Sequence, residues 1–517
     1  MKYFFILLVL LVVEPVYTAG KNVTGIVFND KNKNGIYDAG DIVMPDVCVS
    51  NQREVVKTDA QGRYQLPLRK NAFIYVVKPQ GYALQLDEDN IPQGNYYHHP
   101  KGTPRNLKYP GVEPTAKQPV EINFPLYATG LKTNFRMLAL GDPQMPNDEA
   151  LDYFRDGAVA DLFRHQADFY MVHGDIADDH LLIYPREKKI MGKLNVPGYH
   201  VPGNHDVNYR SEDRVNDFET YRMAYGPDYY AFNYGNVHFI VLNNIAYQGW
   251  DKLNNKAGRY TGNLDDTQLE WLQNDLATVP HNRLIVINSH IPFLEGPAQK
   301  EAVVKLHQML SDRQAVLSLS GHTHQVNTYR LDENSHWPYP GMHEGVILGA
   351  TCGSWWSNPK DENGIPVATC NDGSPRGYFV FDFMGVDYSY RFIPFHYRDD
   401  FQMRVSLPQG RLQQSELADT DIVVNWFVGK PQQKVEVRIN GGAVRLMENF
   451  YGTDPFYEGT LDIRKTDPAY PPRARETQHL WKVALPVDLP VGTHHIEVTA
   501  YGDKGKTYQA IKLFAVE

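Results

Sequence analysis

Cysteine is scarce in this chain, since only three of the 517 residues are cysteine: Cys48, Cys352 and Cys370. Three cysteines are too few for a disulfide-framework fold or for a zinc ribbon built on four thiolates. In an oxidising compartment Cys352 and Cys370 could pair across a short loop, and the sequence leaves that disulfide open. Cys48 would be left over, and we expect it to be a small buried side chain.

An excess of positive charge is also lacking. Lys and Arg total 51 against 61 Asp and Glu, which gives a formal net charge of −10. A mildly acidic chain is a poor non-specific binder of nucleic acid or anionic membrane, so stable nucleic-acid binding is not expected. Beyond the first twenty residues, no stretch is apolar over the roughly twenty residues that a bilayer span needs.

The first twenty residues have the pattern of a secretory signal. Lys2 precedes the apolar run Tyr3–Val13, and small residues follow, with cleavage expected near Ala19 or Gly20. No cysteine lies near the cleavage region, so a lipoprotein is not predicted. The mature protein is therefore predicted to be secreted or periplasmic. A buried strand or an uncleaved anchor is the alternative interpretation of this segment.

Glycine, proline and tyrosine are abundant, with 40, 34 and 33 residues. This bias favours a β-rich and loop-rich architecture over a helical bundle. The hydrophobic fraction of 42% and the charged fraction of 22% are those of a globular protein, which excludes wholesale disorder. At roughly 150 residues per domain, the length predicts about three domains.

The character of the sequence changes twice along the chain. Residues 21–127 contain short alternating runs without helical periodicity, which predicts a small β-sandwich domain. In residues 128–400, strand-like runs alternate with amphipathic helical stretches, which predicts a sheet layered with helices. Residues 401–517 return to β runs with turns spaced as in a sandwich. The clearest helices are expected over 147–166, 266–277 and 297–310, the second with a cap at Asp266.

Five short polar motifs follow strand-like runs of the middle region. In α/β folds, ligands bind beyond the carboxyl ends of the strands, so we expect these motifs to meet at one face. Residues two apart on an extended segment point the same way, so Asp142 and Gln144 can chelate together, as can His322 and His324. The motifs are GDPQ at 141–144, GDIADD at 174–179, GNHD at 203–206, NSH ending at His290, and GHTH at 321–324.

The side chains collected in these motifs are carboxylates, amides and imidazoles. Such mixed ligands suit borderline-hard divalent ions such as Mn, Fe or Zn. Six or seven ligands are too many for one tetrahedral zinc ion and suit a pair of metals. The motifs therefore predict a centre of two divalent metal ions.

In this order along residues 135–330, the motifs resemble those of the calcineurin-like metallophosphoesterases, D-x-H, GD-x-x-D, GNH-[DE], H and GH-x-H. The chain matches four of these five blocks as written. The resemblance implies a four-layer α/β (α+β) sandwich core, here flanked by an N-terminal and a C-terminal β-sandwich. It assigns Asp142, Gln144 and His324 to one metal, Asn204, His290 and His322 to the other, and Asp175 to both.

Gln144 departs from the family pattern, which usually has His at this position. A neutral amide oxygen is a weaker ligand than imidazole, so the first metal should be looser or a harder ion such as Mn or Mg. Some branches of the family also carry Gln here, among them pyrophosphatases of ADP-ribose and CDP-alcohols. Activity is therefore expected, with the substrate left open.

The mechanism that this site implies is hydrolysis by a hydroxide bridging the two metals, which attacks phosphorus in line without a protein nucleophile. His205 is the expected general acid for the leaving group, because histidine can carry a proton near neutral pH. Asp206 is expected to orient its ring and to favour the protonated form. Asp178, the last residue of GD-x-x-D, is expected to support the site without binding metal.

Several residues outside the motifs are candidates for substrate binding. Trp355 and Trp356 are adjacent, so on a strand one would pack in the core and the other would face the metals, where it could stack on a ring. Arg376 is a candidate anion clamp, because its fork suits bidentate contacts. Tyr209 and Arg210 follow GNHD and could border the substrate. The alternative for 341–378 is a rigid surface loop.

The N-terminal region carries a possible calcium loop, NDKNKNGIYDAGD. Its oxygen-bearing side chains have the spacing of a calcium-binding loop, but strands flank it, so it is not an EF-hand. The segment resembles the loop in B-type repeats of bacterial surface adhesins. The alternative is a turn stabilised by its own side-chain hydrogen bonds. The candidate ligands are Asp30, Asn32, Asn34, Asp38 and Asp41.

The leading hypothesis is a secreted two-metal phosphoesterase that hydrolyses a phosphomonoester or phosphodiester of a small molecule, sugar or lipid. A nucleotide-sugar or nucleotide-alcohol pyrophosphatase is the enzymatic alternative, suggested by Gln144 and by the tryptophan pair. A surface- or carbohydrate-binding protein with a vestigial central site is the alternative from another class. The sequence does not predict the oligomeric state.

Overall fold

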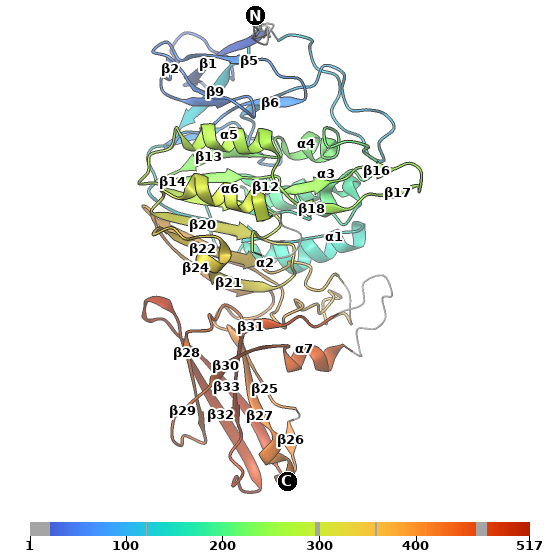
Figure 1. Cartoon of the computed structure of the whole chain (residues 1–517), viewed down its shortest axis with the longest axis vertical. Coiled ribbons are helices and arrows are strands. Elements are labelled where there is room, and N and C mark those ends of the chain that lie inside the picture. Colours follow the sequence, from blue (N-terminus) through green and yellow to red (C-terminus); the bar gives the residue numbers. More distant parts are fainter. Residues whose placement is uncertain (1–20, 120, 295–299, 357–358, 409, 462–472) are drawn as a thin grey trace, which may run out of the picture.

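The computed structural model of the chain describes residues 21–119, 121–294, 300–356, 359–408, 410–461 and 473–517. The predicted signal segment at 1–20 lies outside these residues. The strands nearest the N-terminus lie at one end of the elongated molecule, those nearest the C-terminus lie at the other, and the helices gather mainly between them (Figure 1). None of the described helices is long and apolar enough to cross a membrane.

Short strands form two sheets at the N-terminal end, with the orders β2-β1-β9-β7, where β5 also pairs with β1, and β4-β3-β6-β8. Alternate side chains of these strands are buried, as in β5, and they share one apolar core. The strands are β1 Asn22–Asn29, β2 Ile42–Val43, β3 Cys48–Ser50, β4 Val55–Lys57, β5 Arg63–Pro67, β6 Ala72–Val76, β7 Tyr82–Leu84, β8 Asn95–His98 and β9 Phe124–Ala128.

Two mixed sheets form the middle of the molecule, with the orders β12-β11-β10-β23-β24 and β13-β14-β19-β20-β22-β21. Each has a parallel part, β10-β11-β12 in one and β14-β19-β20-β22 in the other. The strands are β10 Asn134–Leu140, β11 Phe169–His173, β12 Gly198–Val201, β13 Tyr230–Tyr234, β14 Val237–Val241, β19 Leu284–Asn288, β20 Ala315–Ser320, β21 Val326–Arg330, β22 Met342–Leu348, β23 Gly377–Met384 and β24 Asp387–Pro394.

Buried side chains of both mixed sheets meet in one apolar cluster. The parallel strands are apolar at nearly every position because they are covered on both faces. A second cluster joins the five-stranded sheet to α1 (Asp148–Phe154), α3 (Tyr184–Met191) and α4 (Glu219–Tyr225). A third joins the six-stranded sheet to α5 (Asp266–Leu276) and α6 (Lys300–Leu310). The sheets therefore hold the ends of their parallel strands in fixed positions.

The predicted helices are confirmed with changed ends. The helix expected over 147–166 consists of α1, a π-helical turn over Arg155–Val159 and α2 (Ala160–Leu162). The cap of α5 is Asp265, whose side chain accepts a hydrogen bond from the Gln268 amide, so the prediction of Asp266 as the cap is wrong by one residue. The expected start of α6 at 297 lies outside the described residues.

Between β14 and α5 the chain forms two antiparallel ribbons, β15 (Ile245–Tyr247) with β18 (Tyr260–Gly262) and β16 (Trp250–Asp251) with β17 (Lys256–Ala257). This hairpin, residues 245–262, projects beside the strand ends (Figure 1). It brings Tyr260 within 6.1 Å of His322, measured between ring centroids.

The C-terminal residues form two further sheets, with the orders β25-β27-β31-β30 and β26-β33-β32-β28-β29, around one apolar core. A single short α-helix, α7 (Pro455–Thr460), occurs in the described part of this region, together with 3-10 helices over Gln414–Asp419 and Asp503–Gly505. The strands are β25 Met403–Ser406, β26 Arg411–Leu412, β27 Asp421–Trp426, β28 Lys434–Ile439, β29 Arg445–Leu446, β30 Glu448–Gly452, β31 Thr477–Ala484, β32 Gly492–Tyr501 and β33 Thr507–Val516.

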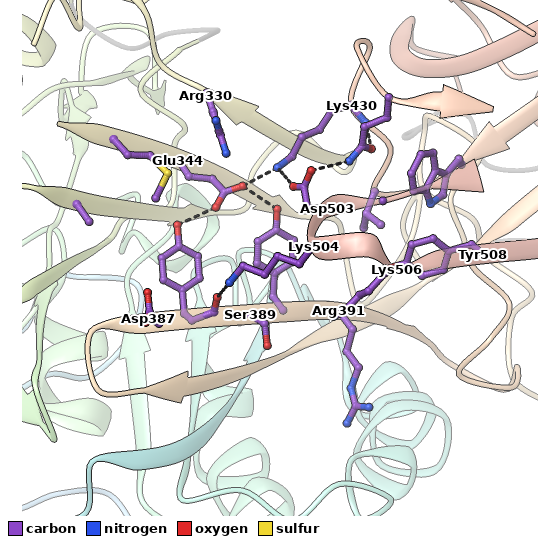
Figure 2. A pocket seen from close by; sticks show the side chains of 18 of the residues that line it. Arg330, Glu344, Asp387, Ser389, Arg391, Lys430, Asp503, Lys504, Lys506 and Tyr508 are labelled. Atoms are coloured by element: carbon purple, nitrogen blue, oxygen red, sulfur yellow. Dashed lines mark hydrogen bonds and ion pairs between the residues drawn. The ribbon is translucent and has the colours of Figure 1, made fainter. Parts of the chain in front are cut away.

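A buried ion pair joins the C-terminal region to the six-stranded sheet (Figure 2). Glu344 of β22 accepts hydrogen bonds from the hydroxyls of Tyr388, at 2.7 Å, and Tyr390, at 3.0 Å. The Lys430 ammonium lies 2.8 Å from Glu344 and 2.8 Å from Asp503. These residues line a cavity of about 420 Å³.

The segment between β8 and β9 runs back over the middle region. Tyr97 and Thr103 both donate hydrogen bonds to the buried carboxylate of Glu219 on α4, at 2.6 and 2.7 Å. Further along, Asn208 donates to the Tyr109 carbonyl at 3.0 Å, and the Lys108 amide donates to Asn208 at 3.2 Å. The N-terminal region is thereby attached to the loop that carries the GNHD motif.

Candidate metal centre

The polar motifs lie at the carboxyl ends of parallel strands from both mixed sheets. Asp142 follows β10 and Asp175 follows β11, while the 3-10 turn Asn204–Asp206 follows β12. From the other sheet, His290 follows β19, and the GHTH segment at 321–324 follows β20. Because carboxyl ends of neighbouring parallel strands share one edge, residues far apart in the chain meet here.

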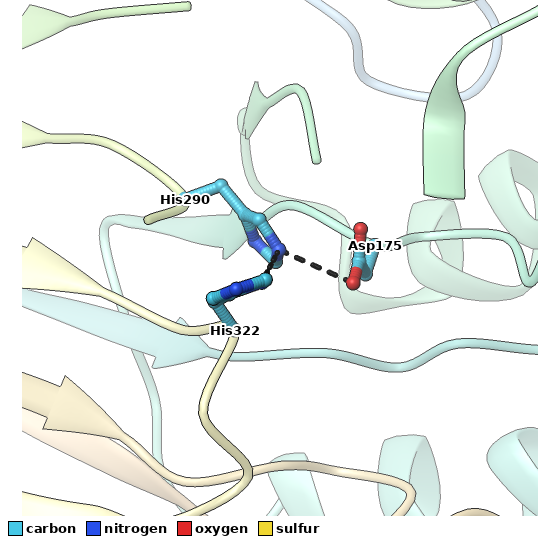
Figure 3. Close-up of side chains that lie close together, drawn as sticks. All are labelled: Asp175, His290 and His322. Atoms are coloured by element: carbon cyan, nitrogen blue, oxygen red, sulfur yellow. Dashed lines mark hydrogen bonds and ion pairs between the residues drawn. The ribbon is translucent and has the colours of Figure 1, made fainter. Parts of the chain in front are cut away.

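His290 lies at the centre of the cluster (Figure 3). Its Nε2 atom is 3.2 Å from Asp175 Oδ2, 3.1 Å from Asn204 Oδ1 and 3.3 Å from His322 Nδ1. Its Nδ1 atom donates to the carbonyl of His173, at 2.8 Å. That bond leaves Nε2, the atom facing Asp175, Asn204 and His322, free to bind a cation.

Asp142 adjoins the cluster between His290 and His324. One of its carboxylate oxygens lies 3.7 Å from His324 Nε2 and 4.0 Å from His290 Nε2. The carboxylate accepts the backbone N–H of His322 at 2.9 Å. Burial and the nearby charge of Asp175 together raise the pKa of Asp142 to about 8, despite the opposing effect of His290. Two buried carboxylates whose charges act on each other favour a bound cation, which would relieve their desolvation and repulsion.

Most of the cluster residues have a left-handed backbone. Their φ angles are positive, between 46° and 72°. The expectation that Asp142 and Gln144, or His322 and His324, lie on extended segments is therefore wrong, because tight turns direct these side chains. Left-handed conformations of non-glycine residues are costly and gather at functional sites. The residues are Asp142, Gln144, Asp175, His322 and His324.

Three motif glycines make room for the cluster. A Cβ atom on Gly174 would overlap the His290 ring, and one on Gly203 would overlap the backbone of Asp175. A Cβ on Gly321 would overlap the carboxylate of Asp142. Gly174 in addition has a φ of 80°. The glycines are thus required for the close approach of the candidate ligands.

Gln144 is buried beside the cluster, and its side-chain oxygen accepts a hydrogen bond from the Cys352 thiol, with 3.7 Å between sulfur and oxygen. Its backbone N–H donates to the Asp175 carbonyl at 2.7 Å. Cys352 and Cys370 are both free buried thiols, so the disulfide that the sequence left open is not formed. Cys48, also a free thiol, is half-buried against an apolar cluster.

His205 is held by a different acid from the one predicted. Its Nδ1 atom lies 2.9 Å from Asp179 and 3.2 Å from Asp178, and its backbone N–H donates to Asp175 at 2.8 Å. Burial lowers the pKa of His205, but the negative charges of Asp175, Asp179 and Asp178 outweigh burial and raise the pKa to about 10. These negative charges favour the protonated ring.

Asp206 does not contact the His205 ring, so the prediction that it orients this ring is wrong. The Asp206 carboxylate faces inward from the 3-10 turn. There it accepts hydrogen bonds that close the strand-end loops. The donors are the backbone N–H groups of Ile176, Ala177 and Gly203 and the hydroxyl of Tyr184.

The two adjacent tryptophans diverge. Trp355 packs against the rings of His205 and His324, with centroids 5.9 and 4.9 Å away. Trp356 turns toward the helix-covered core and donates to the Pro143 carbonyl at 2.7 Å. Arg376 is buried, with its guanidinium 5.0 Å from the Trp356 ring centroid. Burial lowers the pKa of Arg376 to about 10. The burial of Arg376 and its contact with Trp356 place it behind that ring, away from the surface.

A cavity of about 510 Å³ has in its wall Asp179, which binds His205, and Tyr260, whose ring lies near His322. Tyr209 lines it and donates to the carbonyl of Asn204 at 2.7 Å, whereas Arg210 lies against Trp250, 5.9 Å from its ring, and is not part of the lining. Of the lining residues, sequence reasoning named only Tyr209 as a candidate for substrate binding. No motif marks Lys108, Arg259 or Tyr260, and Asp179 carries only the signal of its place in GDIADD.

The candidate calcium loop is closed by its own hydrogen bonds. Asp30 accepts the N–H groups of Lys33 and Gly35, at 2.7 and 2.8 Å. The amide groups of Asn32 and Asn34 donate to Asp38, at 3.1 and 2.7 Å. Asp41 accepts from two backbone N–H groups. These are the bonds that the turn alternative requires, and the structural calcium stays a prediction.

The central cluster fits divalent metal ions. Ligand atoms of Asp175, His290 and His322 lie within 4.8 Å of one another, and Asn204 and Asp142 adjoin them. Carboxylate oxygen, amide oxygen and imidazole nitrogen are the donors that Mn, Fe and Zn accept. Asp178, Asp179 and His205 form a second such group, in which the acids bind the His205 ring instead.

Three protein-family models match the chain. They are the N terminal of calcineurin-like phosphoesterase over residues 30–109, calcineurin-like phosphoesterase over 135–326, and the C terminal of calcineurin-like phosphoesterase over 346–508. The second range contains the motifs Gly141–Gln144 and Gly321–His324. The resemblance seen in the sequence is therefore confirmed at the level of the family.

The chain is also similar to individual phosphoesterases. It is 26% identical over 169 residues to a 3',5'-cyclic-nucleotide phosphodiesterase of Nostoc sp., which is 31% of this chain and 58% of that protein. It is 27% identical over 169 residues to a probable glycerophosphodiester phosphodiesterase of Arcobacter nitrofigilis, with the same coverage. It is 27% identical over 161 residues to purple acid phosphatase 15 of Arabidopsis thaliana, which is 26% of this chain and 27% of that protein.

The chain thus spans little more than half the length of the two diesterases. Among solved structures, a dimetal phosphatase from Danio rerio shares 17% identity over 50% of this chain and 98% of that one. The TM-score of that pair is 0.31.

Proposed function

The chain belongs to the calcineurin-like phosphoesterase superfamily, and from this premise we propose that it is a metal-dependent hydrolase of phosphoric esters. The observation that carries the proposal is the convergence of Asp142, Asp175, Asn204, His290 and His322 at the strand ends. A vestigial site would have no need to keep buried acids and imidazoles together, since burying them without a cation is costly.

We assign the metal ligands as the motifs suggest. One ion would be held by Asp142, Gln144 and His324, the other by Asn204, His290 and His322, and Asp175 would touch both. When bound, two divalent ions activate the attacking water and neutralise the phosphoryl oxygens. The Cys352 thiol bond to Gln144 supports this assignment, because it fixes the amide that replaces the usual imidazole.

The residues of this chain then supply orientation and a proton. His205 lies at the edge of the cluster, with its Nδ1 atom held by Asp179, which leaves Nε2 to face the substrate. We assign it the role of general acid, which gives its Nε2 proton to the leaving oxygen as the phosphorus–oxygen bond breaks. Asp179 and Asp178 position this ring, and Asp206 stabilises the loops around it.

For the whole chain, we propose a cleaved signal at 1–20 and export from the cytoplasm. We further propose a four-layer sandwich core over 128–400, with β-sandwich domains over 21–127 and 401–517. The apolar cluster shared by the two mixed sheets and the helix-bearing clusters outside them support the layering. The separate cores at the two ends support the flanking domains.

The test is turnover of p-nitrophenyl phosphate and bis(p-nitrophenyl) phosphate by purified protein with added Mn²⁺. We expect hydrolysis that EDTA abolishes and Mn²⁺ restores. Asp175→Asn should lower kcat by about 100-fold or more and reduce metal content, because it removes the charge shared by both ions. Asp382→Asn, which changes a half-buried acid of β23 paired with Arg136, is the matched control. Unchanged activity in Asp175→Asn would overturn the two-metal proposal, and the ratio of the two substrates separates diesterase from monoesterase.

A further inference from the structure

The cavity beside His205 has a chemical character of its own. It is lined by the cations Lys108 and Arg259, by the rings of Tyr209 and Tyr260, and by Asp179. Asp179 is engaged with the His205 ring, which it shares with Asp178. Among the residues that the structure describes, neither Lys108 nor Arg259 has a carboxylate partner. The lining therefore presents two cations, neither of them paired with a carboxylate, beside two aromatic faces.

The two cations come from distant parts of the chain and are held in place by backbone bonds. The Lys108 amide donates to Asn208 at 3.2 Å, and the next residue, Tyr109, donates its hydroxyl to the Asp179 carbonyl at 2.6 Å. The Lys108 ammonium lies 3.5 Å from that same carbonyl. Arg259 lies at the base of the hairpin, where its carbonyl accepts from Gln248 at 2.9 Å.

The cavity lies on the side of the metal cluster where the acid that holds His205, the proposed proton donor, forms part of the wall. Its wall residue Asp179 binds His205, the proposed proton donor to the leaving oxygen. Its wall residue Tyr209 bonds to the carbonyl of Asn204, and Tyr260 lies 6.1 Å from His322. A phosphoryl group at the cluster would therefore extend its ester substituent into this cavity.

We propose that this cavity is a subsite for a leaving group that is itself an anion, bound by Lys108 and Arg259. This inference rests on the proposed function and names its substrate class: an ester or anhydride whose departing part carries a phosphate or carboxylate on a flat ring or sugar. In the reaction, water adds to phosphorus, the bond to the leaving oxygen breaks, and His205 protonates that oxygen. The anionic group is unchanged and stays paired with the two cations until release.

The experiment compares two substrates that differ in one charge, 4-carboxyphenyl phosphate and 4-carbamoylphenyl phosphate. We expect the wild type to favour the carboxylate by about tenfold in kcat/KM, because an ionic hydrogen bond to an exposed cation discriminates by roughly this factor. Lys108→Met and Arg259→Met should each reduce the preference, and the double variant should bring the ratio close to one. Added salt should weaken it in the wild type, since the cations are at the surface.

The matched controls remove an equal charge nearby. Lys256→Met changes the same hairpin and Lys101→Met changes the same N-terminal segment, and neither residue lines the cavity. Both should keep the wild-type ratio. Turnover of both substrates without a charge preference, or a preference that survives in the double variant, would overturn the subsite.

Failure of the proposed function gives a different result. Neither substrate would then be turned over, and the subsite is tested by saturation-transfer NMR with 4-hydroxybenzoate and 4-hydroxybenzamide. If the wild type transfers more saturation to 4-hydroxybenzoate than to 4-hydroxybenzamide, and the double variant does not, the subsite is supported without any turnover. Equal transfer to the two ligands would overturn it.

Discussion

The residues of the metal centre carry backbone strain. Five of the seven assigned ligands have positive φ, and none of these five is glycine. Each such residue costs about 1–2 kcal/mol relative to its relaxed conformation. The parallel strands that end directly before Asp142, Asp175 and His322 are fully buried at these ends, so the sheets hold the turns in place. The sheets therefore preorganise the centre.

At the residue scale, the proton-donor assignment leads to a sharp prediction for His205→Ala. An alkyl leaving group needs a proton, whereas p-nitrophenolate leaves without one. We expect kcat for an alkyl phosphate such as glycerol phosphate to fall by about 100-fold or more, and kcat for p-nitrophenyl phosphate to fall far less. Steady-state kinetics on both substrates, with metal content measured alongside, checks this.

Asp179→Asn provides the companion variant, because it removes the charge that holds the His205 ring and leaves the ring itself. The Asp179→Asn variant should lose part of its activity on alkyl phosphates and keep its bound metal. An equal loss on alkyl and aryl phosphates in His205→Ala would contradict the acid role.

At the scale of the elements, the site is made where strands end. Gly174 joins β11 to the turn of Asp175, and Gly321 joins β20 to the turn of His322. A strand that ends in glycine can turn sharply with no side chain to displace the neighbouring ligand. The GD and GH pairs therefore act as structural units, in which the glycine permits the turn and the following residue supplies the ligand.

Gly174→Ala tests this unit. Its φ of 80° is strained for alanine, and its new Cβ would overlap the His290 ring. We expect metal affinity and kcat to fall by about 10- to 100-fold, as for other changes that displace a ligand. Metal titration and kinetics provide the measurement.

Gly385→Ala is the matched control for this change. Its φ is 66°, yet nothing lies within 4 Å of the added Cβ. It should lower stability modestly and leave the metal centre intact. If both variants lost metal equally, backbone strain alone would explain the loss and the proposed overlap with His290 would be wrong.

At the scale of the whole molecule, polar contacts join the three regions. On the N-terminal side, Tyr97 and Thr103 converge on Glu219. On the C-terminal side, Glu344 and Lys430 pair across the boundary, and their side chains are 8% and 6% exposed. Because a buried charge without its partner is costly, each contact favours one relative placement of the regions. Lys108, from the same N-terminal segment, lines the cavity near His205.

Lys430→Met should lower the free energy of unfolding by about 3 kcal/mol, because it leaves Glu344 without its cation. The double variant Lys430→Met with Glu344→Gln should recover part of this loss. Thermal unfolding followed by calorimetry checks both, and turnover at the metal centre should remain, since the pair is remote from it.

Lys434→Met is the control, because Lys434 pairs with Glu436 on an exposed strand surface and such pairs contribute little. Its melting temperature should match the wild type. A loss in Lys434→Met equal to that in Lys430→Met would contradict the role given to burial.

The sequence by itself determined the ligand types, their order and the change from β to α/β and back to β. These features are local, since a ligand pair such as Asp142 and Gln144 and the strand before it are read from a few adjacent residues. Only the tertiary structure decided which acid binds His205 and that Lys108 lines the cavity. Those contacts depend on how loops far apart in the chain are packed, as with Tyr109 and Asp179, and hydrophobic periodicity carries no information about that.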